Sequence, residues 1–149
     1  MSHTSSIKGM VMTDINALKA AVADLASQGI KVSIIPDATP RAYYTDQKGL
    51  GRADFVIKLA DAPYDVGIYA TKTADGRTTY EARTDFWGQH VERILGVPCS
   101  DAALRDQSKL GKLFQAYGVQ TTMNALRAQG KTPVRQRDAA GNEKLTIQF

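Results

Sequence analysis

The central part of the sequence, residues 53–84, alternates apolar and polar side chains at every second position. The stretch ADFVIKLA sets Phe55, Ile57 and Leu59 against polar neighbours, and YDVGIYATK and TTYEART flank the segment TADGR. Alternation with a period of two is typical of a half-buried β-strand, and an Asp-Gly pair between two such strands indicates a hairpin. The region therefore predicts consecutive antiparallel strands, which argues against a doubly wound fold with a helix between most strands.

The N-terminal part predicts a strand, a helix and a second strand. SSIKGMVM alternates, with Ile7 and Val11 on one side, and predicts a first strand. Asp14 can cap a helix whose apolar residues recur at helical spacing as far as the stop signal at Gly29. The next strand, KVSII, is expected to end at Pro36.

The C-terminal third predicts helices and a closing hairpin. Asp85 can cap the helix FWGQHVERILG, and Asp101 can cap a longer helical region. Gly118 lies between two apolar stripes of that region, so two helices and one kinked helix both fit. PVRQRDAAGNEKLTIQF follows as a hairpin. Because no linker divides the chain, residues 1–149 are expected to form one α+β domain, a mostly antiparallel sheet with helices packed on one face.

Composition limits the compartment and the partners. The single cysteine suits a reducing cytoplasm, and no signal peptide or membrane span is expected. The net charge of +4 favours anionic partners such as nucleotides. Two histidines cannot form a multi-histidine metal site and no Walker-type phosphate loop occurs, so neither a metal nor a cofactor is expected. Sequence-specific nucleic-acid binding is not predicted, because the chain lacks a recognition-helix motif and a basic stripe.

Short motifs in a shared order resemble one known family. They are MSHTSSIK, ADFVI, YDVG, YEARTDFW and the closing helix-glycine-hairpin. The order is similar to that of the hypothetical chloroplast reading frame thirty-five family, a domain-of-unknown-function family with relatives in plastids, cyanobacteria, other bacteria and bacteriophages. The resemblance implies no defined activity. It does imply that Ser2 and His3 belong to the family pattern, whereas position alone would predict a disordered terminus.

The segment PRAYYTDQKGLGR interleaves cations with tyrosines. Cations that hold phosphate, beside rings that stack on bases, are typical of nucleotide recognition, although tyrosines on a sheet edge with solvated cations would give the same pattern. A histidine near the N-terminus can act as a proton donor or acceptor at neutral pH. The predicted ligand-binding residues are Ser2, His3, Lys8, Arg41, Tyr43, Tyr44, Lys48, Arg52, Trp87 and His90.

Strand parity adds a second place for a ligand. Asp65 and Tyr69 share a parity opposite to Val66 and Ile68, which predicts an exposed sheet face. Such a face, if it is concave, is a usual place for a small molecule.

Three functions remain open from the sequence. The first is a protein that binds an anionic, nucleotide-like small molecule, and the phage relatives suggest a version that sequesters a nucleotide immune signal. The second is a metal-independent phosphodiesterase with His3 as its catalytic acid or base. The third is a protein–protein interaction module with no small-molecule ligand. The oligomeric state is left open.

Overall fold

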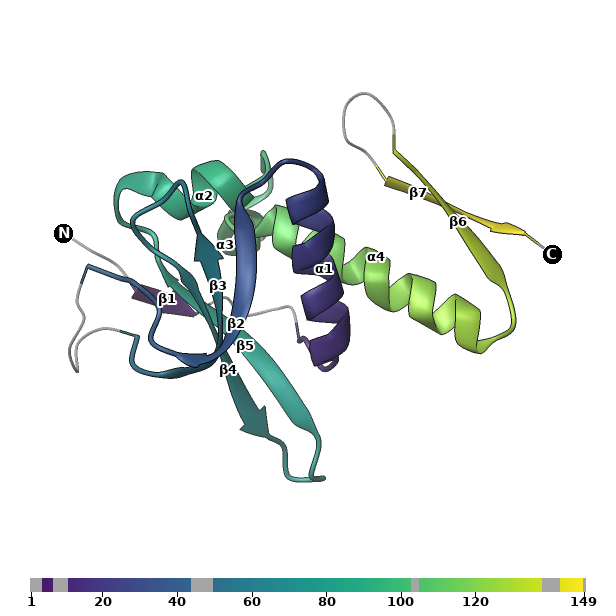
Figure 1. Ribbon diagram of the computed structural model, residues 1–149, viewed down its shortest axis with the longest axis horizontal. Helices are drawn as coiled ribbons and strands as arrows, with labels where there is room; N and C mark the ends of the chain where they lie inside the picture. The colour runs from purple at the N-terminus through teal and green to yellow at the C-terminus, as the bar shows by residue number, and fades with distance from the viewer. Residues whose placement is uncertain (1–3, 7–10, 44–49, 103–104, 138–142, 149) are drawn as a thin grey trace.

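The protein is an α+β fold built on one five-stranded antiparallel sheet (Figure 1). The computed structural model describes residues 4–6, 11–43, 50–102, 105–137 and 143–148. In spatial order the strands are β1 (Thr4–Ser6), β5 (Thr78–Asp85), β4 (Val66–Lys72), β3 (Ala53–Leu59) and β2 (Val32–Ala38). Each neighbouring pair is antiparallel, which confirms the predicted sheet and the hairpin between β4 and β5.

The helices lie on one face of this sheet, as predicted. Figure 1 shows α1 (Ile15–Ser27) and α4 (Gly111–Ala128) packed against each other on that side. The shorter helices between β5 and α4 are η1 (Trp87–Gln89), α2 (His90–Leu95) and α3 (Arg105–Ser108). One hydrophobic core joins both layers and includes Leu18, Ile57, Leu59, Val66, Ile68, Leu95, Leu110 and Leu113. In the described part of the chain, no helix is long and apolar enough to span a bilayer.

The chain closes with the predicted hairpin, which forms a separate two-stranded sheet from β6 (Thr132–Arg137) and β7 (Glu143–Gln148). Figure 1 shows it beyond the helices rather than on the main sheet. Two guanidinium nitrogens of Arg135 donate to the Asp24 carboxylate of α1 at 2.7 and 2.6 Å. This bidentate ion pair ties the hairpin to the helical layer.

Helix α1 begins and ends at its predicted signals. Asp14 is the N-cap, and its Oδ1 accepts a hydrogen bond from the backbone N–H of Ala17 at 3.0 Å. After the helix, Gly29 adopts a φ of 93°, and Gly130 after α4 adopts a φ of 76°. Left-handed backbone at these two positions favours glycine, because other residues carry a Cβ that crowds this conformation.

Removal of the α1 cap should have a moderate effect on stability. Replacement of Asp14 with alanine leaves the Ala17 amide without its capping acceptor, and we expect the free energy of unfolding to fall by about 1 kcal/mol. Asn16→Ala, at an exposed position of the same helix, is the control and should change stability by about 0.5 kcal/mol or less. Urea denaturation of both variants measures the difference. Equal stability of the two variants would contradict a capping role for Asp14.

The predicted first strand is formed in part, because β1 comprises Thr4–Ser6 and Met12 adds an isolated bridge to Tyr80. Ile7 and Lys8 lie outside the described residues, and Val11 is 68% exposed. Met12 is buried instead, because its carbonyl accepts a 2.7 Å hydrogen bond from the Tyr80 N–H and holds it at an isolated bridge to β5.

Two predicted boundaries also differ from the structure. Strand β2 continues through Pro36 to Ala38, because β2 is an edge strand whose free side tolerates the missing N–H. At Gly118, where the sequence left two helices and one helix open, the structure has a single helix, α4, which runs through this residue. Asp85 is the last residue of β5 rather than a helix cap, and η1 begins after Phe86.

Candidate ligand-binding site

A row of polar side chains crosses the sheet on the face opposite α1 and α4. Its members, on four neighbouring strands or strand ends, are Ser33, Lys58, Asp65 and Asp85. Ser33 pairs with Lys58 in the β2–β3 ladder, and Asp65 directly precedes β4 at the strand end between Lys58 and Asp85. Since adjacent strands lie about 4.8 Å apart, the row spans on the order of 14 Å.

Asp65 is fully buried and accepts five hydrogen bonds. Arg41 donates Nε and Nη2 to its two oxygens at 3.0 and 2.8 Å, and the Arg41 backbone N–H donates at 2.9 Å. Lys58 Nζ donates at 2.9 Å and the Leu59 N–H at 3.2 Å. Burial alone would raise the pKa of Asp65, but Arg41 and then Lys58 and Leu59 outweigh it, so the pKa is lowered.

Asp65 therefore does not line an exposed sheet face, and this prediction is wrong. The segment 39–43 lies along the polar row, with Pro40 and Ala42 buried, and brings Arg41 over the carboxylate. The alternation of side chains along the strand correctly predicts the face of the sheet on which Asp65 lies. It does not predict that residues 39–43 cover that face. Tyr69, the other member of the predicted face, is half-buried and donates its hydroxyl to the Leu50 carbonyl at 2.6 Å.

Asp85 is the second fully buried carboxylate of the row. Its Oδ2 accepts from the backbone N–H of Tyr43 at 2.9 Å, and its Oδ1 accepts from the N–H of Trp87 at 2.9 Å. Thr4 of β1 is its partner in the sheet. Its side chain thus joins the β2–β3 connection to the start of η1, while its backbone pairs with the N-terminal strand.

Four aromatic rings run from the surface toward the core beside Asp85. The centroids of Tyr43 and Trp87 are 6.1 Å apart, those of Trp87 and His90 are 6.3 Å apart, and those of His90 and Tyr64 are 5.9 Å apart. Tyr43 is 58% exposed and Trp87 is 38% exposed, whereas Tyr64 is buried. Burial, followed by the nearby Asp85 carboxylate, raises the pKa of Tyr64.

The backbone explains why Trp87 is exposed. The sequence predicts one helix in which Trp87 shares an apolar face with Val91, but Gly88 has a φ of 70° and Gln89 a φ of 60°. These two left-handed residues, the last two of η1, interrupt the helical path before α2, so Val91 faces the core and Trp87 does not. Gln89 is one of the two described non-glycine residues with positive φ, a strained conformation that clusters at functional sites.

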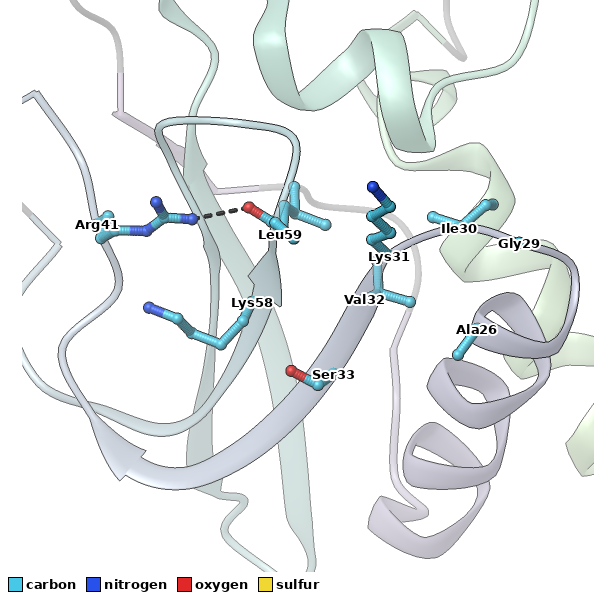
Figure 2. A pocket seen from close by; sticks show the side chains of 10 residues that line it. Ala26, Gly29, Ile30, Lys31, Val32, Ser33, Arg41, Lys58 and Leu59 are labelled. Carbon is cyan, nitrogen blue, oxygen red and sulfur yellow. Dashed lines mark hydrogen bonds between the residues drawn. The ribbon is translucent and has the colours of Figure 1, made fainter.

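At the other end of the polar row lies an open pocket of about 870 Å³. It lies around the start of β2, between the end of α1 and the end of β3 (Figure 2). Figure 2 shows Arg41 and Lys58 side by side on one side and Lys31 on the other, with Ser33 between them on β2. Gly29 and five apolar residues complete the lining: Ala26, Ile30, Val32, Leu59 and Ala60.

Of the predicted ligand-binding residues, four come together around this row: Arg41, Tyr43, Trp87 and His90. Arg52 does not join them. It pairs with exposed Asp37 at 2.6 Å and lies six residues before Lys58 along β3, roughly 20 Å away. The remaining predicted residues, Ser2, His3, Lys8, Tyr44 and Lys48, lie outside the described residues.

Sequence reasoning missed Lys31, Lys58 and Asp85 as parts of the site. Lys58 reads as an ordinary outward residue of a half-buried strand, and Asp85 reads as a local helix cap. The contact of Asp85 with Tyr43 joins residues 42 positions apart, so no local pattern reveals it. Among the residues that the structure describes, no group of three His, Cys, Asp or Glu side chains is placed to hold a metal ion.

Comparisons with known proteins add no relative. No family model matches the chain, and neither a curated protein nor a solved structure matches it. The resemblance to the hypothetical chloroplast reading frame thirty-five family therefore stays an expectation that rests on the order of short sequence motifs.

Proposed function

We propose that this protein binds an anionic, nucleotide-like small molecule, with its phosphate in the pocket beside β2. The observation that carries the proposal is the position of three cations, Lys31, Arg41 and Lys58, around one pocket with an apolar lining. Its volume of about 870 Å³ falls within the range of small-molecule sites. The nucleotide immune signal suggested by the sequence resemblance belongs to this ligand class.

The charges of the pocket favour an anion. Arg41 and Lys58 share the single carboxylate of Asp65, so this group keeps one excess positive charge. Lys31 adds a third cation, and its contact with Asp61 is long, at 3.8 Å between two exposed groups. Hydrogen bonds from cations to phosphate are the stronger kind, and Asp65 holds Arg41 and Lys58 in place before a ligand arrives.

Binding and cleavage can be separated in one experiment. The purified protein is incubated with inorganic phosphate, AMP, ATP and cyclic di-AMP, and depletion of free ligand is measured before the protein is heat-denatured. Intact nucleotide recovered from the supernatant supports binding, and an altered nucleotide supports the phosphodiesterase alternative, which depends on His3. If no nucleotide is depleted at millimolar concentration, the proposal is wrong.

Lys31 is the residue best suited to test the pocket. Because its side chain is 70% exposed and only loosely paired, Lys31→Ala should leave the melting temperature unchanged while the affinity for AMP falls about tenfold. Lys72→Ala, which removes an exposed cation from the distant end of β4, is the matched control and should bind AMP like the unmodified protein. Isothermal titration calorimetry measures both. Equal affinity of the two variants would show that the pocket does not hold the phosphate.

A further inference from the structure

The exposed rings of Tyr43 and Trp87 form a surface that phosphate binding does not explain. We infer that this pair is a stacking platform for the base of the ligand and that Asp85 positions it, an inference that rests on the proposed function. The ligand is then a molecule with a phosphate at one end and a planar, nucleobase-like ring at the other.

The exposure of these rings is unusual for this molecule. Among the described residues, the exposed large hydrophobic side chains are Val11, Ile35, Tyr43, Trp87 and Val97. The two aromatic members of this set neighbour each other, at 6.1 Å between centroids and 42° between ring planes. Each exposed ring offers an apolar face on which any base can stack, because every base has a π-face, and the second ring, tilted against the first, can contact the edge of that base.

Asp85 fixes both rings through their backbones. Tyr43 and Trp87 lie 44 positions apart in the sequence, yet both backbone N–H groups donate to the two oxygens of this one buried carboxylate. The left-handed turn at Gly88 and Gln89 then directs α2 away from Trp87. A platform held in this way needs little ordering when a ligand binds, which favours affinity.

The platform and the phosphate pocket share one segment of chain. Arg41 binds Asp65 and lines the pocket, whereas Tyr43, two residues later, binds Asp85. The polar row that joins both ends spans on the order of 14 Å. A single nucleotide-sized molecule can therefore contact the cations at one end and the rings at the other.

Trp87 gives a direct measurement, because it is the only tryptophan of the chain. Titrations of the full chain with AMP, GMP, CMP and UMP are compared with ribose 5-phosphate, which has the same phosphate and sugar but no base. We expect at least one nucleotide to quench the Trp87 fluorescence and to bind about tenfold or more tightly than ribose 5-phosphate. Ribose 5-phosphate should bind without quenching.

Variants separate positioning from folding. Tyr43→Ala should reduce nucleotide affinity about tenfold and leave ribose 5-phosphate affinity unchanged, whereas the exposed control Val11→Ala should change neither. Asp85→Asn keeps one carbonyl acceptor for two amides, so it should lower the ratio of nucleotide affinity to ribose 5-phosphate affinity. A general loss of folded protein would leave this ratio unchanged. Equal binding of ribose 5-phosphate and all four nucleotides would overturn the platform and leave the phosphate pocket standing. Binding of neither would overturn both proposals.

Discussion

Asp65→Asn is expected to lower the free energy of unfolding by about 3 kcal/mol or more, because hydrogen bonds to charged groups each contribute about 1.5–3 kcal/mol. Asparagine has one acceptor oxygen and an NH₂ group that cannot accept. Some of the N–H groups that surround position 65 would therefore point at this NH₂ group and lose their hydrogen bonds. The donors are two nitrogens of the Arg41 side chain, Lys58 Nζ and two backbone amides. Urea denaturation measures the loss, provided that the variant and the unmodified protein show the same dependence of the free energy of unfolding on urea concentration.

The contribution of Asp65 to the free energy of unfolding should decrease as the pH falls. Its pKa in the folded protein lies below the ordinary value of 3.8, so the unfolded chain takes up a proton at a higher pH than the folded chain. The stabilisation is therefore fully present above about pH 4 and is lost as the pH falls through the lowered pKa of the folded state. The stability difference between the unmodified protein and Asp65→Asn should narrow below pH 4.

Asp37→Asn is the matched control for Asp65→Asn. Asp37 also pairs with an arginine, Arg52, but both groups are exposed and exposed ion pairs contribute little. Its φ of 50° is left-handed, a conformation that asparagine tolerates well. We expect a change of about 0.5 kcal/mol or less at position 37. A similar loss in both variants would contradict the assignment of the stability to the buried cluster.

The cluster also determines how the pocket can be studied. Arg41 lines the pocket and at the same time neutralises a buried carboxylate. Its removal leaves Asp65 with Lys58 as its remaining ion-pair partner among the described residues, so an Arg41 variant loses stability and ligand contact together. Lys31 has no such structural role in the core, which is why its replacement separates affinity from folding.

The fold was largely predictable because its signals are local. The alternation in β3, the Asp-Gly turn between β4 and β5 and the cap at Asp14 each act within a few residues. Met12 shows the limit of such local signals. The position of Met12 depends on its bridge to Tyr80, a contact 68 residues away in the sequence that alternation alone does not contain.

The site was only partly predictable because long-range contacts build it. Composition singled out Arg41 and Tyr43 as a basic and aromatic segment, and the structure adds that a buried carboxylate holds each of their backbones. Both carboxylates come from strand ends that the sequence assigns to other roles, an exposed face for Asp65 and a helix cap for Asp85. Trp87 shows the converse, because a left-handed turn exposes a ring that a regular helix would bury.

Asp85→Ala is expected to lower the free energy of unfolding by about 2 kcal/mol, because two amides lose a charged acceptor. Each 2.9 Å hydrogen bond to this carboxylate contributes about 1.5–3 kcal/mol, and removal of the buried charge returns part of that sum, which sets the expected net loss. Hydrogen exchange should show fast exchange of the Tyr43 and Trp87 amides in this variant, while the amides of β3 stay protected.

Asp54→Ala is the control for Asp85→Ala, because Asp54 also accepts from a backbone amide but is exposed. Asp54 Oδ2 also accepts from a backbone amide, that of Ala70 at 2.7 Å, but it lies at an exposed position where water replaces the lost acceptor. We expect a loss of about 0.5 kcal/mol at position 54. If Asp54→Ala costs as much as Asp85→Ala, burial does not set the strength of the Asp85 contacts. If the Tyr43 and Trp87 amides stay protected in Asp85→Ala, this carboxylate does not hold the two segments together, and the rings owe their positions to packing alone.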